Sequence, residues 1–165
     1  MTLVVTHISA ATASLTWALW ERIRFGKASM VGLVTGTIAG LASITPASGS
    51  VGPMEAMIIG GIAGVLTQEM CHVIKNKLKI DDTLDVFAVH GVGGIFGTLM
   101  IAVFGGATWL AQLTTLGVVG IYTVVVSFII VYAVKIFTPI RVTDEEEFRG
   151  LDISSHGERA YDHTS

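Results

Sequence analysis

Five apolar stretches, separated by short polar or glycine-rich segments, run along this chain. They cover residues 3–20, 28–45, 53–74, 85–104 and 111–137. A helix needs about 20 consecutive apolar residues to cross a bilayer, so each stretch is long enough to span. Pro139 follows the fifth stretch and predicts its end, because proline cannot continue a helix. The pattern predicts an all-α fold, a polytopic membrane bundle of five transmembrane helices.

Composition supports this interpretation and excludes several protein classes. The chain has 165 residues, of which 52% are hydrophobic and 14% charged, whereas soluble domains are about a quarter charged. Disorder is excluded by the apolar content. The single cysteine, Cys71, excludes an internal disulfide framework, and the net charge of -3 offers no basic field for nucleic acid.

The basic residues fall on alternate sides of the predicted spans. All ten lie after the first span, after the third span, or at the end of the chain: Arg22, Arg24, Lys27; Lys75, Lys77, Lys79; Lys135, Arg141, Arg149, Arg159. The loops 45–52 and 105–110 carry none. The positive-inside rule therefore predicts a multi-pass protein of the cell membrane with the N-terminus outside and the C-terminus in the cytoplasm.

The C-terminal segment differs in composition from the rest, which predicts a bundle over 1–138 and a cytoplasmic tail over 139–165. Between residues 138 and 165 there are seven acids against three arginines, a net of -4. Thr143 and Glu146 have capping-box spacing, and Gly150 supplies a stop, so we predict a short helix over 144–149. A merely solvated tail is the alternative.

Glycines recur every four residues within the second, third and fourth apolar stretches. The repeats are Gly32, Gly36, Gly40; Gly60, Gly64; and Gly93, Gly97. Because lipid provides little hydrophobic drive between helices, small residues allow the close backbone approach that holds a membrane bundle together. They predict tight packing and no chemistry by themselves.

His90 is the most informative polar residue. It lies inside the apolar run 86–103, in which Thr98 is the one other polar side chain. Burial disfavours the imidazolium, so we expect a neutral ring that requires a donor and an acceptor as partners. A structural hydrogen bond and a pore for a small polar solute are both open explanations. Val86 precedes His90 by one turn and shares its face, so a solute that passes His90 should also pass Val86.

Other polar residues favour structural roles. Asp81, Asp82 and Asp85 gather at the start of the fourth helix, where acids complement the helix dipole and cap free amides; a proton relay is the less favoured alternative. Glu69 could pair with His72 or with nearby basic residues, and His7 is expected to be a packing or interface group.

Sequence motifs of catalytic and metal sites are absent. The sequence contains no P-loop, HExxH or GxSxG pattern and no convergent set of metal ligands. We therefore expect neither an enzyme nor a cofactor.

Three segments together resemble the ammonium transporter family, the Amt/Mep/Rh proteins. They are residues 45–53 (TPASGSVGP), 81–94 (DDTLDVFAVHGVGG) and 150–161 (GLDISSHGERAY). The resemblance covers nearly the whole chain in order. It implies the last five helices, seven to eleven, of an eleven-helix fold that assembles as a homotrimer with one pore per subunit.

The resemblance also implies site residues and partners. His90 matches the second member of the family's paired pore histidines, Val86 a residue of the cytoplasmic half of the pore, and Asp85 an acid at the start of that helix. The first pore histidine and the outer gate belong to helices that this chain is expected to lack. The tail segment implies regulation from the cytoplasm and a PII-type signalling partner; its residues are Gly150, Leu151, Asp152, Ser154 and Tyr161.

The sequence thus predicts transport of ammonium or ammonia through a hydrophobic pore to which this chain supplies one histidine. The alternative is a noncatalytic membrane subunit or fragment that packs with a partner and binds a cytosolic regulator, with His90 as a structural hydrogen-bonding group.

Overall fold

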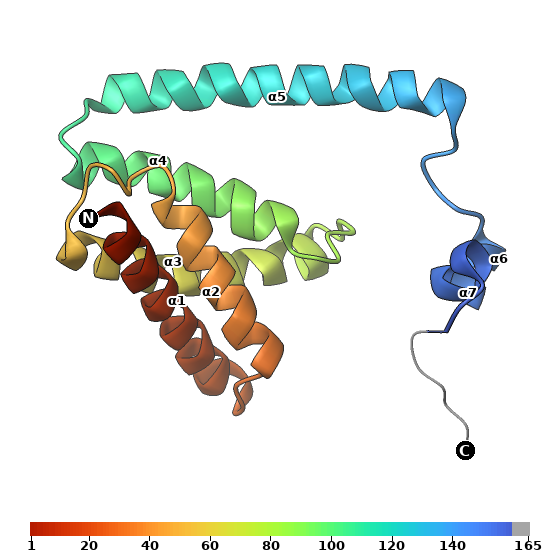
Figure 1. The fold of residues 1–165 in the computed structure, drawn as a ribbon, viewed down its shortest axis with the longest axis horizontal. Coiled ribbons are helices and arrows are strands. Elements are labelled where there is room, and N and C mark those ends of the chain that lie inside the picture. Colours follow the sequence, from red (N-terminus) through yellow and green to blue (C-terminus); the bar gives the residue numbers. More distant parts are fainter. Residues whose placement is uncertain (160–165) are drawn as a thin grey trace. The chain divides into compact units, whose positions relative to one another are not determined.

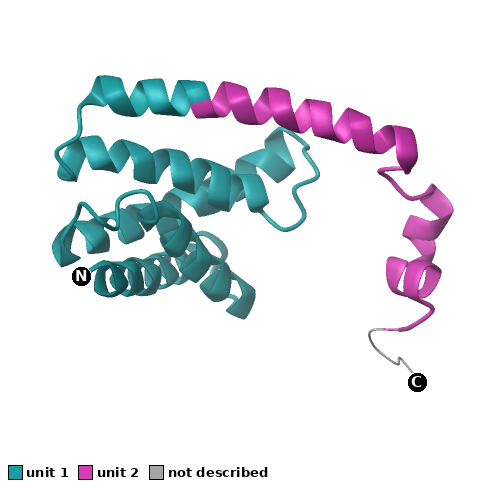
Figure 2. Ribbon diagram, turned by 45° about the horizontal axis from the view of Figure 1, so that its top comes forward, with its two compact units in different colours: residues 1–118 teal, residues 119–165 magenta. Residues whose placement is uncertain are grey.

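The computed structural model describes residues 1–159, which form helices joined by short connections. In chain order the helices are α1 (Thr2–Phe25), α2 (Met30–Ile44), α3 (Pro53–His72), the π-helices η1 (Val73–Lys77) and η2 (Phe87–Val92), α4 (Gly93–Phe104), α5 (Trp109–Phe137), α6 (Asp144–Arg149) and α7 (Leu151–His156) (Figure 1). The chain divides into two compact units, and the boundary between them falls within α5, after Val118 (Figure 2). The predicted all-helical class is confirmed.

The helix ends in the first unit follow local rules. Gly26 terminates α1 in the left-handed conformation, with φ of 78°, which glycine adopts without steric cost. Ser29 caps α2 by accepting a hydrogen bond from the Gly32 amide at 2.8 Å. Pro53 opens α3 at a position where its missing N–H is no loss.

Helix α1 packs closely against both α2 and α3. The buried Ser9 hydroxyl donates to the Gly40 carbonyl at 3.0 Å, and Ser14 donates to the Leu33 carbonyl at 2.9 Å. These two contacts run in opposite directions along the chain, so α1 and α2 are antiparallel. Glu69 of α3 meets the C-terminal part of α1, which makes α1 and α3 parallel.

The repeated glycines lie in these contacts, as the four-residue spacing predicted. A Cβ at Gly40 or at Gly60 would collide with the Ser9 carbonyl oxygen. A Cβ at Gly97 of α4 would collide with the Ser43 carbonyl oxygen. Real Cβ atoms do not approach so closely, so these backbones touch because no side chain intervenes.

The spans differ in length from the prediction. Four segments are long and apolar enough to cross a membrane: Thr2–Phe25, Pro53–Lys77, Phe87–Phe104 and Trp109–Phe137. Helix α2 has 15 residues, about 22 Å at about 1.5 Å per residue, and is shorter than the predicted stretch 28–45. It begins at the Ser29 cap and gives way to turns from Thr45.

The sequence predicted α5 and α6 but not α7. None of the 29 residues of α5, all within the described part, is buried in this chain, and the helix ends at Phe137, two residues before Pro139. The predicted capping box is confirmed: the Thr143 hydroxyl accepts from the Glu146 amide, and the Glu146 carboxylate accepts from the Thr143 amide. Helix α7 was not predicted.

Candidate functional site

His90 and Val86 lie on the exposed side of the segment that begins the fourth span. Val86 is 53% exposed and His90 is exposed, whereas Ala88 and Val89 between them are 0% and 2% exposed. Val89 packs in a buried cluster with Trp17 and Ala39. One side of η2 is therefore fixed in the bundle, and the side with His90 is free within the described chain.

The turn that carries His90 is a π-helix, η2, and not the α-helix that the sequence predicted. A π-helical turn holds more residues than an α-helical turn, is rare, and occurs frequently at functional sites. Regular α-helix resumes at Gly93. No hydrophobic pattern distinguishes these two conformations, which is why the sequence did not reveal it.

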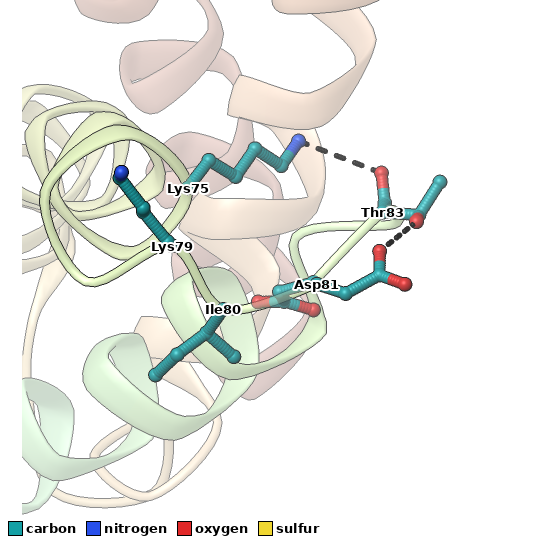
Figure 3. Close-up of a pocket in the computed structure, with 6 residues that line it drawn as sticks. Lys75, Lys79, Ile80, Asp81 and Thr83 are labelled. Carbon is teal, nitrogen blue, oxygen red and sulfur yellow. Dashed lines mark hydrogen bonds between the residues drawn. The ribbon is translucent and has the colours of Figure 1, made fainter.

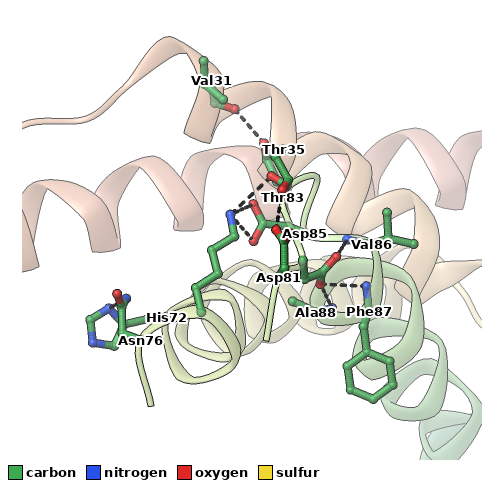
Figure 4. Close-up of polar contacts among 12 residues, drawn as sticks. Val31, Thr35, His72, Asn76, Asp81, Thr83, Asp85, Val86, Phe87 and Ala88 are labelled. Atoms are coloured by element: carbon green, nitrogen blue, oxygen red, sulfur yellow. Dashed lines mark hydrogen bonds and ion pairs between the residues drawn. The ribbon is translucent and has the colours of Figure 1, made fainter. Parts of the chain in front are cut away.

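Asp82 caps the start of η2. Its carboxylate accepts hydrogen bonds from the amides of Val86, Phe87 and Ala88 at 2.8, 3.0 and 3.4 Å (Figure 4). These amides have no partner within their own helix, and a carboxylate at a helix N-terminus also complements the dipole. Asp82 thus sets where the helix begins.

Asp85 is oriented differently from its neighbour. Its carboxylate binds Lys75 of η1, with Nζ 2.8 Å from each oxygen, and not the amides of η2 (Figure 4). Its backbone has φ of 56°, a left-handed conformation that non-glycine residues rarely adopt. The Lys75–Asp85 pair was missed from the sequence because ten residues and an irregular connection separate the partners.

An open hollow lies beside this connection. Lys75, Lys79, Ile80, Asp81, Asp82 and Thr83 line a space of about 480 Å³ (Figure 3). Within it the Thr83 hydroxyl donates to the Asp81 carboxylate at 2.8 Å. Both charge signs are present and part of the polar lining is already engaged within the loop, so the hollow does not select an ion of either sign.

Glu69 joins α3 to α1 and pairs with a basic residue, which is one of the two pairings expected for it, the other being with His72. Its Oε1 accepts from Trp20 Nε1 at 2.6 Å and from an Arg24 guanidinium nitrogen at 2.7 Å. His72 instead contacts the Asn76 amide at 3.0 Å. His7 is exposed on α1.

These contacts also place the basic residues of the first unit. The Arg24–Glu69 and Lys75–Asp85 pairs join the C-terminal ends of α1 and α3 to the start of η2. The clusters 22–27 and 75–79 therefore follow parallel helices that end on the same side of the unit, as the alternation of charge predicted.

The tail residues form a turn between two short helices. Gly150, with φ of 94°, separates α6 from α7, and its carbonyl accepts from the Ser154 hydroxyl at 2.8 Å. The Asp152 carboxylate accepts from the Ile153 amide at 2.9 Å, and Leu151 is exposed. Tyr161, also a predicted tail residue, lies outside the described residues.

Metal ligands do not converge in the described part of the chain. Among residues 1–159, no group of three or more His, Cys, Asp or Glu side chains is placed to hold a metal ion. Near η2, Asp82 caps the helix and Asp85 is paired with Lys75. On the exposed side of η2, the imidazole of His90 lies among apolar residues.

Known proteins are similar to this chain in sequence and in fold. The sequence model described as the Ammonium Transporter Family matches residues 1–161. The chain belongs to the ammonium transporter family. This is a family of membrane transporters and not of enzymes.

Individual members of the family agree in sequence and in fold. The chain is 37% identical over 172 residues to an ammonium transporter of Bacillus subtilis, covering 94% of this chain and 43% of that protein. The structure of Candida albicans Mep2 matches with a TM-score of 0.79 at 31% identity, covering 94% of this chain and 40% of the other.

A third match is a structure named Sensor Amt Protein. Its TM-score is 0.81 at 32% identity, and the match covers 93% of this chain and 41% of the other. The chain spans less than half the length of the relatives it matches.

Proposed function

We propose that this chain supplies one half of an ammonia-conducting pore, with His90 as one member of a histidine pair and Val86 on its cytoplasmic side. The observation that carries the proposal is the two-sided character of η2. Ala88 and Val89 are buried in the bundle, while Val86 and His90 are open on the other side. Membership of the transporter family gives that open side a substrate class.

The chemistry of the substrate suits such a surface. Moving an ammonium-sized ion into a medium of low dielectric costs on the order of 20 kcal/mol before relaxation. A pore with apolar walls therefore favours the separation of ammonium into ammonia and a proton. A neutral imidazole can donate to or accept from ammonia, and apolar side chains such as Val86 exclude bulk water.

The test is uptake of labelled methylammonium in cells that lack their own ammonium transporters. The chain is expressed alone and fused to the part of the Bacillus subtilis transporter that it does not match. In the form that transports, His90→Ala should lower uptake by at least about tenfold while the amount of folded protein stays within about twofold, because an exposed side chain contributes little to packing.

His7→Ala is the matched control, since His7 is another exposed histidine on a spanning helix. We expect it to transport like the unmodified chain. Uptake that never depends on His90 would instead support the alternative of a noncatalytic subunit in which His90 has a structural role.

The proposal includes a membrane orientation with the N-terminus outside and the C-terminus in the cytoplasm. Single cysteines near Lys27 and Lys77 should be labelled from the cytoplasmic side, and cysteines near Ser48 and Gly106 from outside. The reverse pattern would overturn the orientation and with it the assignment of Val86 to the cytoplasmic half of the pore.

We further propose a homotrimer for the complete transporter and a regulatory tail over 139–165 that follows the bundle 1–138. The Gly150–Ser154 turn gives the tail a defined local structure, which a plain linker lacks. A PII-type protein is the proposed cytoplasmic partner. Removal of residues 143–165, or Ser154→Asp, should change transport at matched expression; equal transport would show that the tail has no regulatory role.

A further inference from the structure

The connection that leads into η2 is conformationally strained at both ends. It begins after η1 with Lys79 at φ of 54° and ends with Asp85 at φ of 56°, directly before Val86. Left-handed conformations of non-glycine residues cost energy, as do π-helical turns, and both persist where the surrounding structure holds them. The structure shows what holds Asp85.

Lys75 holds the end of the connection next to η2. Its Nζ lies 2.8 Å from the Asp85 carboxylate and 3.5 Å from the Thr83 carbonyl oxygen. The Asp85 side chain is 21% exposed and that of Lys75 38%, so the pair is partly shielded from solvent. Because Lys75 belongs to η1, which continues α3, the contact ties the start of the fourth span to the third.

The backbone of Asp85 determines how the following residues face. An α-helix turns by about 100° per residue, so returning a π-helical turn to α-helix, with one residue fewer in the turn, rotates the side chains before it relative to those after it by about that angle. The Asp82 cap fixes the amides of Val86 and Phe87, whereas the Asp85 side chain is paired with Lys75 and lies within hydrogen-bonding reach of Cys71. Loss of the ion pair therefore frees the turn next to His90.

We propose that Lys75 and Asp85 are positioning residues: their ion pair holds Asp85 in the left-handed conformation and so fixes the rotational setting of η2, which presents Val86 and His90 on one side. The effect of this orientation of η2 on transport rests on the proposed function.

Thiol labelling of the 165-residue chain in membranes measures the setting of η2 directly. Cys71, which hydrogen-bonds Asp85, is replaced by serine so that a hydroxyl keeps this contact, and a single cysteine is introduced by Ala88→Cys, at a position that is 0% exposed. With the ion pair intact the thiol should be protected. Lys75→Met should raise its labelling rate by about three- to tenfold, the range that a partly shielded ion pair contributes to a local equilibrium.

Two controls separate rotation of η2 from general unfolding. Ala63→Cys, at a buried position of α3, should stay protected in the Lys75→Met chain. Arg24→Met removes another ion pair of similar length, 2.7 Å, at the same end of the bundle, and should leave the Ala88→Cys labelling rate unchanged. Equal deprotection of Ala63→Cys would show that Lys75 stabilises the whole bundle, which overturns the proposal.

Further variants separate charge from backbone strain. Asn tolerates the left-handed conformation but carries no charge, so Asp85→Asn should raise Ala88→Cys labelling as much as Lys75→Met does. The double variant should label no faster than either single variant, because both remove the same contact. Lys75→Arg should restore protection. Additive effects, or no rescue by arginine, would contradict a direct pair.

Transport provides the second measurement. In the transport-competent form, Lys75→Met should change the ratio of ammonium to methylammonium uptake by at least about twofold, whereas lost folded protein would lower both uptakes equally. An unchanged ratio together with unchanged labelling would overturn the proposal. A chain that labels as expected but never transports would contradict the proposed function and leave the setting of η2 supported.

Discussion

Glycine occurs both in the packed helices α2, α3 and α4 and in α5, yet it has different consequences in the two regions. In α2, α3 and α4, a Cβ at Gly40, Gly60 or Gly97 would collide with the backbone of a neighbouring helix. In α5, a Cβ at Gly117 or Gly120 would meet no heavy atom of the described chain within 4 Å. The same residue is a packing requirement in one region and has no such role within this chain in the other.

Hydrogen bonds differ between the regions in the same way. Ser9 of α1 is fully buried and donates to another helix, whereas Thr115 of α5 is exposed and donates to the Ala111 carbonyl of its own helix. Apolar content identifies both regions as membrane helices, while the contacts between helices determine which substitutions this chain tolerates.

The largest expected effect comes from filling a glycine contact. Gly97→Ala and Gly60→Ala should each lower the free energy of unfolding in detergent by about 1–3 kcal/mol or more, because the helices must move apart. Gly120→Ala should be neutral or stabilising by up to about 1 kcal/mol, since alanine is the better helix former. A denaturation titration measures all three, and equal losses would show that the α5 glycines are also packed.

The next effect compares an ion pair that joins two helices with an ion pair in the exposed tail. Glu69 accepts hydrogen bonds from Trp20 and Arg24 across two helices, whereas Glu147 pairs with Arg141 in the exposed tail. Glu69→Ala should lower the unfolding free energy by about 1 kcal/mol, and Glu147→Ala by less than about 0.5 kcal/mol. A thermal shift for Glu147→Ala as large as that for Glu69→Ala would contradict this ranking.

A similar loss is expected for the buried serine of α1. Ser9→Ala removes the hydroxyl that donates to the Gly40 carbonyl, and should cost about 1 kcal/mol. The control is Thr115→Ala in α5, for which we expect no measurable change in the same titration. A neutral Ser9→Ala would show that glycine contacts alone hold α1 to α2.

The smallest effect is a pH dependence of the tail. Hydrogen bonds from the Thr143 amide and hydroxyl lower the pKa of Glu146 below its ordinary value of about 4.3. The stabilisation is therefore present above that value and is lost as the pH falls through the lowered pKa of the folded tail. Circular dichroism of a tail peptide should show less helix below about pH 4 than at pH 7.

Thr143→Ala removes the hydroxyl that accepts from the Glu146 amide and donates to the Glu146 carboxylate, and should reduce the helix content of this peptide at pH 7. It should also weaken the dependence on pH. Glu145→Gln, in the same turn, is the matched control and should keep the dependence. A titration that is identical with and without the Thr143 side chain would assign the pH effect to the hydrogen bond from the backbone amide of residue 143 or to the other acids of α6.

Local patterns predicted much of the fold but little of the connection next to His90. The apolar stretches, the capping box at Thr143 and the glycine contacts were confirmed, since each depends on spacing within one segment. The partner of Asp85 and the left-handed residues escaped prediction. They lie in a short irregular segment that joins two spans. Hydrophobic periodicity does not predict the conformation of such a segment.

The sequence alone determined that this chain is a membrane helix bundle and a member of the ammonium transporter family, because apolar length, glycine spacing and three extended motifs are all properties of the linear chain. Only the tertiary structure decided which side of η2 is buried, that Lys75 meets Asp85, and that α2 is shorter than its apolar stretch. Those features depend on helix ends, on irregular connections and on the packing of one helix against another, and no pattern within a single apolar stretch determines them.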